Sequence, residues 1–380
     1  MNSDRTADAF AAAAAVTFPL YPEGPVITLR PADLKSDADV EQILDIEIAD
    51  SLAFTGAAER HTIAQRRALL QSSPMAHMLP VVAEMEMLEG GTQIVGFDTV
   101  FAPRLDNTDT IFSHQVVHPA MRRQGIGRAL AQYALDIAHA TGRTKTSVFA
   151  TVREGEDMDL EAGVILARRA GLKHVSTAGV RVCDLPISED ALARMQDAIG
   201  EQADGYSIEI VQDPIPEDLL EDWGAMLAQL DIDDPDEDYE AEVPTYTPER
   251  IRAAEKRRAD GGVRRVTAIA RHIETGSAVA HTYIEFSDHP ETTLAWQENT
   301  LVMPEHRRRG LARAVKLALH RELATIAPHL TRIITYNSHI NDSMIHINEQ
   351  LGYRRIGSEY IFQGPVPERL DGPAGDSRAV

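Results

Sequence analysis

The feature that most constrains this chain is a loop of arginines and small residues that occurs twice. Residues 117–130 read VHPAMRRQGIGRAL and residues 302–315 read VMPEHRRRGLARAV. The two segments are identical at seven of fourteen positions. Gly125 and Gly310 stand 185 residues apart, which is a domain length and not the short period of a solenoid. The chain is therefore predicted to be an internal duplication.

Each loop lies between a predicted strand and a predicted helix. Behind the second loop, Leu311, Val315 and Leu319 recur at helical spacing. A helix N-terminus offers free backbone N–H groups and the positive end of the helix dipole, and glycine leaves them open to an anion. The pattern predicts a phosphate-binding site at each loop.

The order of secondary structure also repeats. Two apolar strands with a glycine-containing turn precede each loop, at residues 81–101 and 263–286, and this pattern is typical of a β-hairpin. Each half is therefore expected to be α+β, with a mixed, mostly antiparallel sheet flanked by helices. The predicted organisation is a flexible tail at 1–24, a domain at 25–186, a linker helix at 187–205, a domain at 206–363 and a flexible tail at 364–380.

The charge and the composition of the chain exclude several classes of binding partner. The 380-residue chain carries a net charge of −22 and only 5% aromatic residues, which opposes binding to nucleic acids and to anionic membranes. Its single cysteine, Cys183, excludes an intrachain disulfide and a cysteine-built metal site. The alanine run at 11–15 follows an acidic start, unlike a signal peptide, and no apolar segment approaches about 20 residues. We expect a cytoplasmic protein without metal, nucleic-acid or membrane partners; the sequence indicates no oligomeric state.

Both loops fit the pattern Gln/Arg-x-x-Gly-x-Gly/Ala, with Arg122, Gly125 and Gly127 in the first copy and Arg307, Gly310 and Ala312 in the second. The pattern resembles the signature of the GNAT acetyltransferase superfamily. Residues 341–353, NDSMIHINEQLGY, resemble the family's fourth helix and its closing Leu-Gly-aromatic corner. The chain is identified as a tandem member, with a layout similar to that of mycothiol synthase. A dinucleotide-binding loop fits less well, because Leu130 occupies the third glycine position.

The resemblance implies acetyl-CoA as co-substrate, with its pyrophosphate on the second loop and a backbone N–H near Leu301 or Val302 facing the thioester oxygen. Asn337 and Asn341 would orient the pantetheine arm, although they could equally be a strand-end residue and a helix N-cap. The alternative for the arginines is a solvated basic face. The expected cofactor-binding residues are Leu301, Val302, Arg307, Arg308, Arg309, Gly310, Leu311, Ala312, Asn337 and Asn341 in the second copy, and Val117, Arg122, Arg123, Gln124, Gly125, Ile126 and Gly127 in the first.

Glu298 is the candidate general base for the acceptor amine. It lies on the predicted strand before the second loop, two residues after the position where the family often carries a glutamate, which is Trp296 here. Residues two apart on a strand point to the same face. An ordinary exposed strand glutamate is the alternative interpretation, and Glu285 is the reserve candidate.

The sequence identifies the general acid for the departing thiolate less clearly. The family's usual acid is a tyrosine on the fourth helix, and the matching residue is Asn348, which cannot donate a proton in that way. Tyr353, Tyr336 or water are the candidate substitutes. In the first copy, Ser113 and Ala167 occupy the positions of the base and the acid. We therefore expect the second domain to be catalytic and the first to be non-catalytic.

The acceptor is expected to be a small molecule with a primary amine. Eight carboxylates without a basic residue lie between 231 and 242, in a region that borders the acceptor cleft in this family. They could select a cationic acceptor, or they could simply form a solvated acidic loop. The alternative functions are a non-catalytic acyl-CoA-binding or regulatory protein and a protein N-acetyltransferase.

Overall fold

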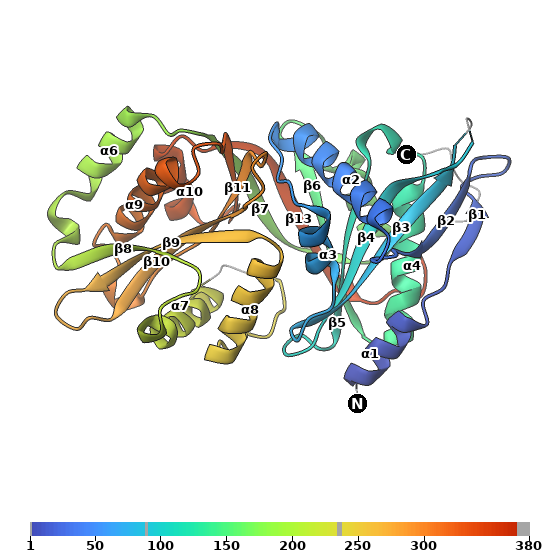
Figure 1. Ribbon diagram of the computed structural model, residues 1–380, viewed down its shortest axis with the longest axis horizontal. Coiled ribbons are helices and arrows are strands. Elements are labelled where there is room, and N and C mark those ends of the chain that lie inside the picture. Colours follow the sequence, from blue (N-terminus) through green and yellow to red (C-terminus); the bar gives the residue numbers. More distant parts are fainter. Residues whose placement is uncertain (1, 88–89, 234–237, 371–380) are drawn as a thin grey trace.

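A computed structural model describes residues 2–87, 90–233 and 238–370, and it shows two α+β domains lying side by side (Figure 1). Domain one contains the helices α1 (Asn2–Ala11), α2 (Asp37–Thr55), α3 (Ile63–Leu70), α4 (Ile126–Thr141) and α5 (Ala162–Arg169). Its strands are β1 (Val16–Pro19), β2 (Val26–Pro31), β3 (Ala76–Glu86), β4 (Thr92–Pro103), β5 (Thr110–Val117), β6 (Lys145–Arg153) and β7 (Lys173–Asp184).

Domain two repeats this order of elements. Its helices are α6 (Glu189–Ile199), α7 (Leu220–Asp233), α8 (Pro248–Asp260), α9 (Leu311–Ile326) and α10 (Asp342–Gln350). Its strands are β8 (Tyr206–Gln212), β9 (Val263–His272), β10 (Ala278–Ser287), β11 (Leu294–Val302), β12 (Arg332–Ser338) and β13 (Arg354–Pro365). The predicted α+β class, with a mostly antiparallel sheet and flanking helices, is confirmed.

The described strands form one continuous sheet of thirteen, in the order β1-β2-β3-β4-β5-β6-β13-β7-β12-β11-β10-β9-β8. The last strand of each domain lies across the domain boundary. β13 pairs antiparallel with β6 of domain one, and β7 pairs antiparallel with β12 of domain two. β7 and β13 also pair with each other near the middle of Figure 1. Each half of the sheet is therefore completed by a strand from the other half.

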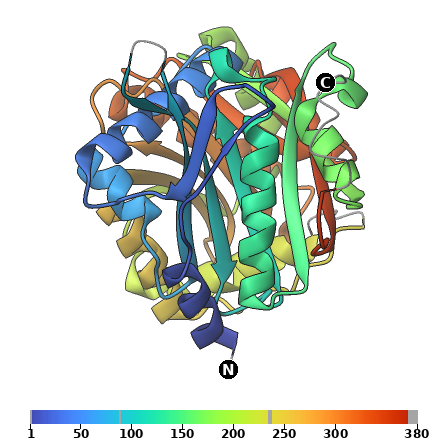
Figure 2. The same cartoon turned by 90° about the vertical axis from the view of Figure 1, so that its right-hand side faces the viewer.

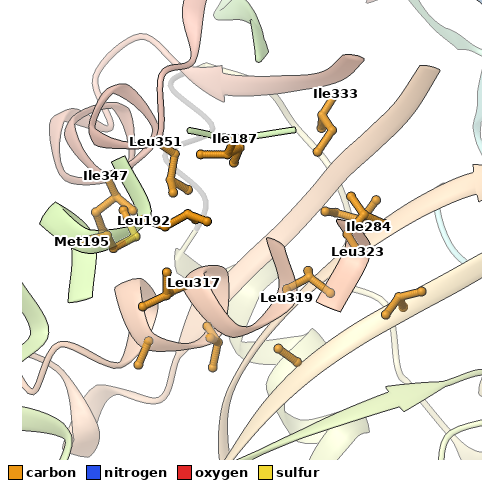
Figure 3. Close-up of a cluster of buried hydrophobic side chains, with 14 of the residues drawn as sticks. Ile187, Leu192, Met195, Ile284, Leu317, Leu319, Leu323, Ile333, Ile347 and Leu351 are labelled. Carbon is orange, nitrogen blue, oxygen red and sulfur yellow. The ribbon is translucent and has the colours of Figure 1, made fainter. Parts of the chain in front are cut away.

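Helices cover both faces of the sheet. In domain one, α4 packs on one face and α2 on the other, and Figure 2 shows the length of α4 against the strands. In domain two, α9 lies on one face and α7 on the opposite face. Figure 3 shows Leu192 and Met195 of α6 close to Leu317 of α9. Since α6 lies within the predicted linker at 187–205, that segment is part of the core of domain two.

The two predicted tails differ from the structure. Residues 1–24 were expected to be flexible, yet they contain α1 and β1, and the Tyr133 hydroxyl donates to the carbonyl oxygen of Ala14 at 2.9 Å. Phe10 packs against the apolar core under α4, so burial of this side chain orders the segment. At the other end β13 runs to Pro365 and Leu370 is buried, whereas 371–380 lie outside the described residues.

Candidate active site

The two arginine-rich loops have the same backbone geometry. Gly125 and Gly310 precede helices α4 and α9 with φ of 91° and 71°, in the left-handed region that favours glycine. Arg123 and Arg308, two residues earlier, also have positive φ, at 65° and 61°. Neither helix has a side-chain cap at its N-terminus, so the first backbone N–H groups are available to an anion. This geometry fits the predicted phosphate site in both domains.

The first arginine of each loop has a structural contact. Nε of Arg122 donates to the carbonyl oxygen of Val117, and Nε of Arg307 donates to that of Val302, each at 3.1 Å. Both guanidinium groups also form an ion pair with a helix of the opposite face, Arg122 with an aspartate of α2 and Arg307 with an aspartate of α7. These two side chains therefore tie the loop to the rest of the domain. Arg308 and Arg309 are exposed beside the helix N-terminus.

The strand before each loop separates from its parallel neighbour. β11 pairs with β12 only from Leu294 to Trp296, and β5 pairs with β6 only from Thr110 to Ser113. Beyond these points the strands diverge towards the loop. The backbone groups of β11 that face the gap are thereby available for an extended ligand.

Domain two has a bulge that domain one lacks. The register of β10 against β11 shifts between Thr282 and Ile284, so one residue of β10 faces two residues of β11, Glu298 and Asn299. The equivalent pair in domain one, β4 and β5, keeps one unbroken register. A bulge redirects side chains and releases backbone groups from pairing, and such irregularities are common beside active sites. It marks the position of Glu298 as structurally distinct from that of Ser113.

A cavity of about 260 Å³ lies where β11 and β12 separate. It is lined by Glu298 and its neighbours on β11, by the end of β12, and by α9 and α10. The two asparagines expected at this site, Asn337 and Asn341, both line it. Asn341 also caps α10, because its Oδ1 accepts from the backbone N–H of Met344 at 3.1 Å. The structural and the ligand-binding interpretations of Asn341 are therefore compatible.

The carboxyl group of Glu298 is set up to exchange a proton near neutral pH. Its side chain is exposed at the cavity. The protein atoms packed around the carboxyl group nevertheless desolvate it, and this desolvation raises its pKa to about 7. The nearby carboxylate of Glu285 raises the pKa further, and Arg265 opposes both effects. Arg265 forms an ion pair with Glu285 at 2.6 Å. Glu285, the second candidate for the general base, is therefore already paired with a guanidinium group.

Asn348, at the position of the family's acid, and Tyr353, one of its candidate substitutes, both lie outside the cavity. Asn348 is fully buried, and its Nδ2 donates to Oδ1 of Asn337 at 2.7 Å, so it holds a cavity residue in place. Tyr353 is 3% exposed and its hydroxyl lies 3.5 Å from Nε2 of His320, in the core beneath α9. Neither is among the described residues that line the cavity. Tyr336 does line it, but burial raises the pKa of its hydroxyl above the ordinary tyrosine value.

Domain one contains the larger cavity, of about 620 Å³, at its own loop. Of the residues expected to bind the cofactor there, the cavity is lined by Val117, Arg122, Arg123, Ile126 and Gly127. It extends to Trp296 and Tyr336 of domain two, so both cavities share these two side chains.

Titratable groups that the sequence did not reveal also line the domain-one cavity, namely Glu47, Glu59, His61, His114 and Glu359. Burial raises the pKa of Glu359 to about 7 and lowers that of His114. The serine and the alanine at the positions of the base and the acid therefore do not leave this cavity without titratable groups. These residues come from α2, the loop after it, β5 and β13, and only β5 is next to the loop in sequence.

The acidic segment at 231–242 makes contacts within the protein. Asp231 accepts from the Tyr246 hydroxyl at 2.9 Å, and Asp233 pairs with Arg307. Glu240 lies 3.2 Å from Lys145 of domain one, and Glu242 accepts from the backbone N–H of Asn107 at 2.7 Å. These four carboxylates join parts of the fold, so the interpretation of the whole segment as an open cation attractor is weakened. Asp234, Asp236 and Glu237 lie outside the described residues.

Two further features concern other classes of function. Among the described residues, no group of three or more His, Cys, Asp or Glu side chains could hold a metal ion. In the described ranges, no helix combines the length and apolarity that crossing a membrane requires.

Comparisons with known proteins agree with the fold. Residues 52–158 match the model of the acetyltransferase (GNAT) family. No curated protein matches the chain. Similar solved structures include a tandem GNAT protein from the clavulanic acid biosynthesis pathway, with a TM-score of 0.70 and 23% identity over 91% of this chain and 99% of that one.

Two other similar solved structures align with most of this chain. A GCN5-related N-acetyltransferase from Sphaerobacter thermophilus has a TM-score of 0.59 and 14% identity, over 92% of this chain and 98% of that one. Saccharomyces cerevisiae N-myristoyltransferase with bound myristoyl-CoA has a TM-score of 0.55 and 10% identity, over 93% of this chain and 85% of that one. At these identities the likeness concerns the fold.

Proposed function

From the tandem GNAT fold of this chain, we propose that it transfers an acetyl group from acetyl-CoA to the primary amine of a small cationic acceptor, and that domain two carries the reaction. The observation that supports this most directly is the bulge in β11. It places Glu298, with a pKa of about 7, where β11 and β12 separate and on the strand that leads to the phosphate-binding loop. The unbroken strand of domain one has a serine there.

The donor would be held by backbone groups of domain two. The N–H groups at the start of α9 and the exposed Arg308 and Arg309 would bind the pyrophosphate. The gap between β11 and β12 would take the pantetheine arm, with Asn337 and Asn341 at its side. A released N–H near Leu301 or Val302 would stabilise the negative charge that develops on the thioester oxygen.

Glu298 would act on the acceptor. A primary amine resembling a lysine side chain has a pKa near 10.4 and arrives protonated, so it must lose a proton before it can attack. A carboxylate with a pKa of about 7 is available for this at neutral pH. Because its pKa is higher, this carboxylate accepts a proton from an ammonium group more favourably than an ordinary glutamate with a pKa near 4.3 does.

The surroundings of the two cavities favour a cationic acceptor. Glu298 lines the smaller cavity, and Glu59 and Glu359 line the larger one on the other side of Trp296 and Tyr336. Carboxylates and aromatic faces both attract ammonium groups. This arrangement supports a cationic amine more directly than the acidic segment at 231–242 does.

Domain one supports a second candidate function. Its larger cavity and its intact loop fit a second acyl-CoA site, whose carboxylates and histidines could also carry protons. A non-catalytic acyl-CoA-binding or regulatory protein would use the same cavity. A protein N-acetyltransferase would need an open groove for a peptide, and the cavity beside Glu298 is small, about 260 Å³.

Release of CoA thiol from acetyl-CoA tests these functions, with spermidine, kanamycin and lysine methyl ester as acceptors. The matched variants are Gly310→Glu and Gly125→Glu, since both place an acidic side chain at a left-handed position of an anion site. We expect Gly310→Glu to abolish turnover and Gly125→Glu to leave most of it, with unchanged circular dichroism in both. The reverse pattern would assign the reaction to domain one. CoA binding without turnover for any acceptor would favour the regulatory protein.

A further inference from the structure

Lys316 of α9 is a buried amine that lines the cavity of domain two. Its side chain is 1% exposed, and it shares the cavity with Glu298 and Asn337. At the offset of 185 residues that relates the two loops, the equivalent residue of domain one is Ala131, which lines the larger cavity. Of the two equivalent positions, only the one in domain two has an amine, and domain two also contains the β11 bulge and Glu298.

The position of Lys316 along the helix places it at the depth of the reacting groups. It follows Gly310 by six residues, about 9 Å along a helix. Glu298 precedes Val302 by four residues, about 13 Å along a strand. Both elements run from the phosphate loop into the domain, so the two side chains reach the cavity at comparable distances from the loop. The thioester end of a CoA anchored at the loop would lie in this part of the cavity.

The surroundings of Lys316 hold no described counter-charge. Its neighbours are the thiol of Cys183 on β7, His320 on α9 and the ring of Tyr353, whose centroid lies 5.9 Å from Nζ. In the described part of the chain, no carboxylate forms an ion pair with it. Burial lowers the pKa of Lys316 to about 7, and Cys183 opposes this effect. Keeping a lysine here costs stability, and an unpaired buried amine facing a cavity indicates a role towards a ligand.

We propose that Lys316 is the general acid that protonates the sulfur of CoA when the thioester is cleaved; this inference rests on the proposed function. The acceptor nitrogen forms a bond to the acetyl carbon, and the carbon–sulfur bond breaks with its electron pair moving to sulfur. The ammonium group of Lys316 gives a proton to that sulfur and becomes an amine. The acceptor nitrogen, which arrives as an ammonium group, loses two protons to Glu298 in turn: Glu298 passes the first to solvent before the attack and takes the second as the amide forms. Exchange with solvent returns both groups to their starting states.

The other candidate acids fit this role less well. Asn348, at the position of the family's tyrosine, has no acidic proton and is hydrogen-bonded to Asn337. Tyr353 is not among the described residues that line the cavity, and burial raises the pKa of its hydroxyl well above the ordinary value. Burial raises the pKa of Tyr336, which makes it a weak donor. An ammonium group with a pKa of about 7 transfers a proton favourably to a thiolate, whose conjugate acid has a pKa near 8.5.

Titration of the thiol of bound CoA tests the proposal without an acceptor. In a Gly125→Glu background, which leaves the loop of domain two as the binding site, thiolate formation is followed by ultraviolet absorbance in the parent and in Lys316→Met. Thiolate formation beside Lys316 favours the protonated amine, so the two groups titrate as a coupled pair, and the thiolate should form about one pH unit or more lower in the parent than in Lys316→Met. Lys256→Met, which removes an exposed lysine paired with Asp260, is the control and should match the parent. Equal pKa values in the parent and Lys316→Met, or CoA binding unaffected by Gly310→Glu, would overturn the proposal.

Kinetics separate this proposal from the proposed function. Lys316→Met should lower kcat by roughly 10²-fold or more at constant KM for acetyl-CoA. The loss should shrink with acetyl thioesters of more acidic thiols, because a better leaving group needs less help from an acid. A loss that is independent of the leaving group would overturn the role of Lys316 and leave the transferase intact. Absence of turnover with every amine in the wild type would instead refute the proposed function, and the thiol titration would still decide on Lys316.

Discussion

Trp296 and Tyr336 stack against each other from adjacent strands, with ring planes 8° apart and centroids separated by 6.2 Å. The pair lies at the point where β11 and β12 part, and it lines both cavities. The indole N–H of Trp296 donates to a carboxylate oxygen of Glu59 in domain one at 3.2 Å. Trp296, at the position where the family often carries a glutamate, therefore lies with Tyr336 between the two cavities and is hydrogen-bonded to domain one.

Replacing Trp296 tests whether this pair borders the acceptor site. Trp296→Ala should raise the KM for the amine acceptor roughly ten-fold, the effect of losing one good contact, because it removes an aromatic face and joins the two cavities. The affinity for CoA, measured by calorimetry, should change little. Trp296→Phe keeps the stacking and should lie close to wild type. An acceptor KM that is the same in all three proteins would show that the pair does not border the acceptor site.

Glu298→Gln should lower kcat by about 10²–10⁴-fold while CoA affinity is retained, since the amide cannot accept a proton from the acceptor. In the wild type the base is active when deprotonated, so the rate should rise with pH through about 7. The variant should lose that rise. Glu274→Gln, in the turn between β9 and β10, is the control for removing a carboxylate far from the cavity. A pH profile unchanged by Glu298→Gln would exclude this residue as the base.

The pKa values of Glu298 and Lys316 together predict a narrow pH optimum for the reaction rate. Glu298 must be deprotonated and Lys316 protonated, and both have pKa values of about 7. The rate of the wild type should therefore rise and fall around neutral pH, as a bell-shaped profile of kcat. Lys316→Met should lose the alkaline limb alone. A wild-type rate that stays constant from neutral to alkaline pH would contradict an acid of this pKa.

Lys316 should also make stability depend on pH. Its pKa falls from 10.5 to about 7 on folding, so between these values the unfolded chain binds more protons than the folded one. The contribution of Lys316 to stability should thus rise as pH increases through this window and be least favourable below pH 7. Lys316→Met should raise Tm at pH 6 by at least about 2–4 °C, the shift expected per 1 kcal/mol in a domain of 150–250 residues. Thermal unfolding followed by circular dichroism should show this gain shrinking towards pH 10.

Separating the domains should destabilise both. Residues 1–205 alone would lack β12 and β13, which leaves one edge of β6 and both edges of β7 without partners. Exposed strand edges of this kind favour pairing between chains. We expect this fragment to dimerise or aggregate in size-exclusion chromatography, and adding residues 206–380 in trans should suppress it. A monomeric, cooperatively folding fragment would show that the strand exchange is dispensable.

The sequence predicted the parts of the site that are local. Gly310, its arginines and the strand before it are contiguous, so their pattern predicted the phosphate loop and the place of Glu298 on that strand. Glu59 and Glu359 could not be found in this way, because the sheet order that brings them to Trp296 depends on exchanged strands far apart in the sequence. Lys316 did leave a signal. It is the one charged residue of the segment AVKLAL at 314–319 in the predicted helix.

Because β7 and β13 are exchanged between the domains, neither half of the gene encodes a complete sheet by itself. A recombination break or stop codon in the connection between them would remove from each half a strand that its sheet requires. Selection on the fold of either domain therefore also preserves the sheet of the other. Its side chains are free to diverge while its backbone is not, which is how one copy can acquire a new ligand without the gene duplicating again.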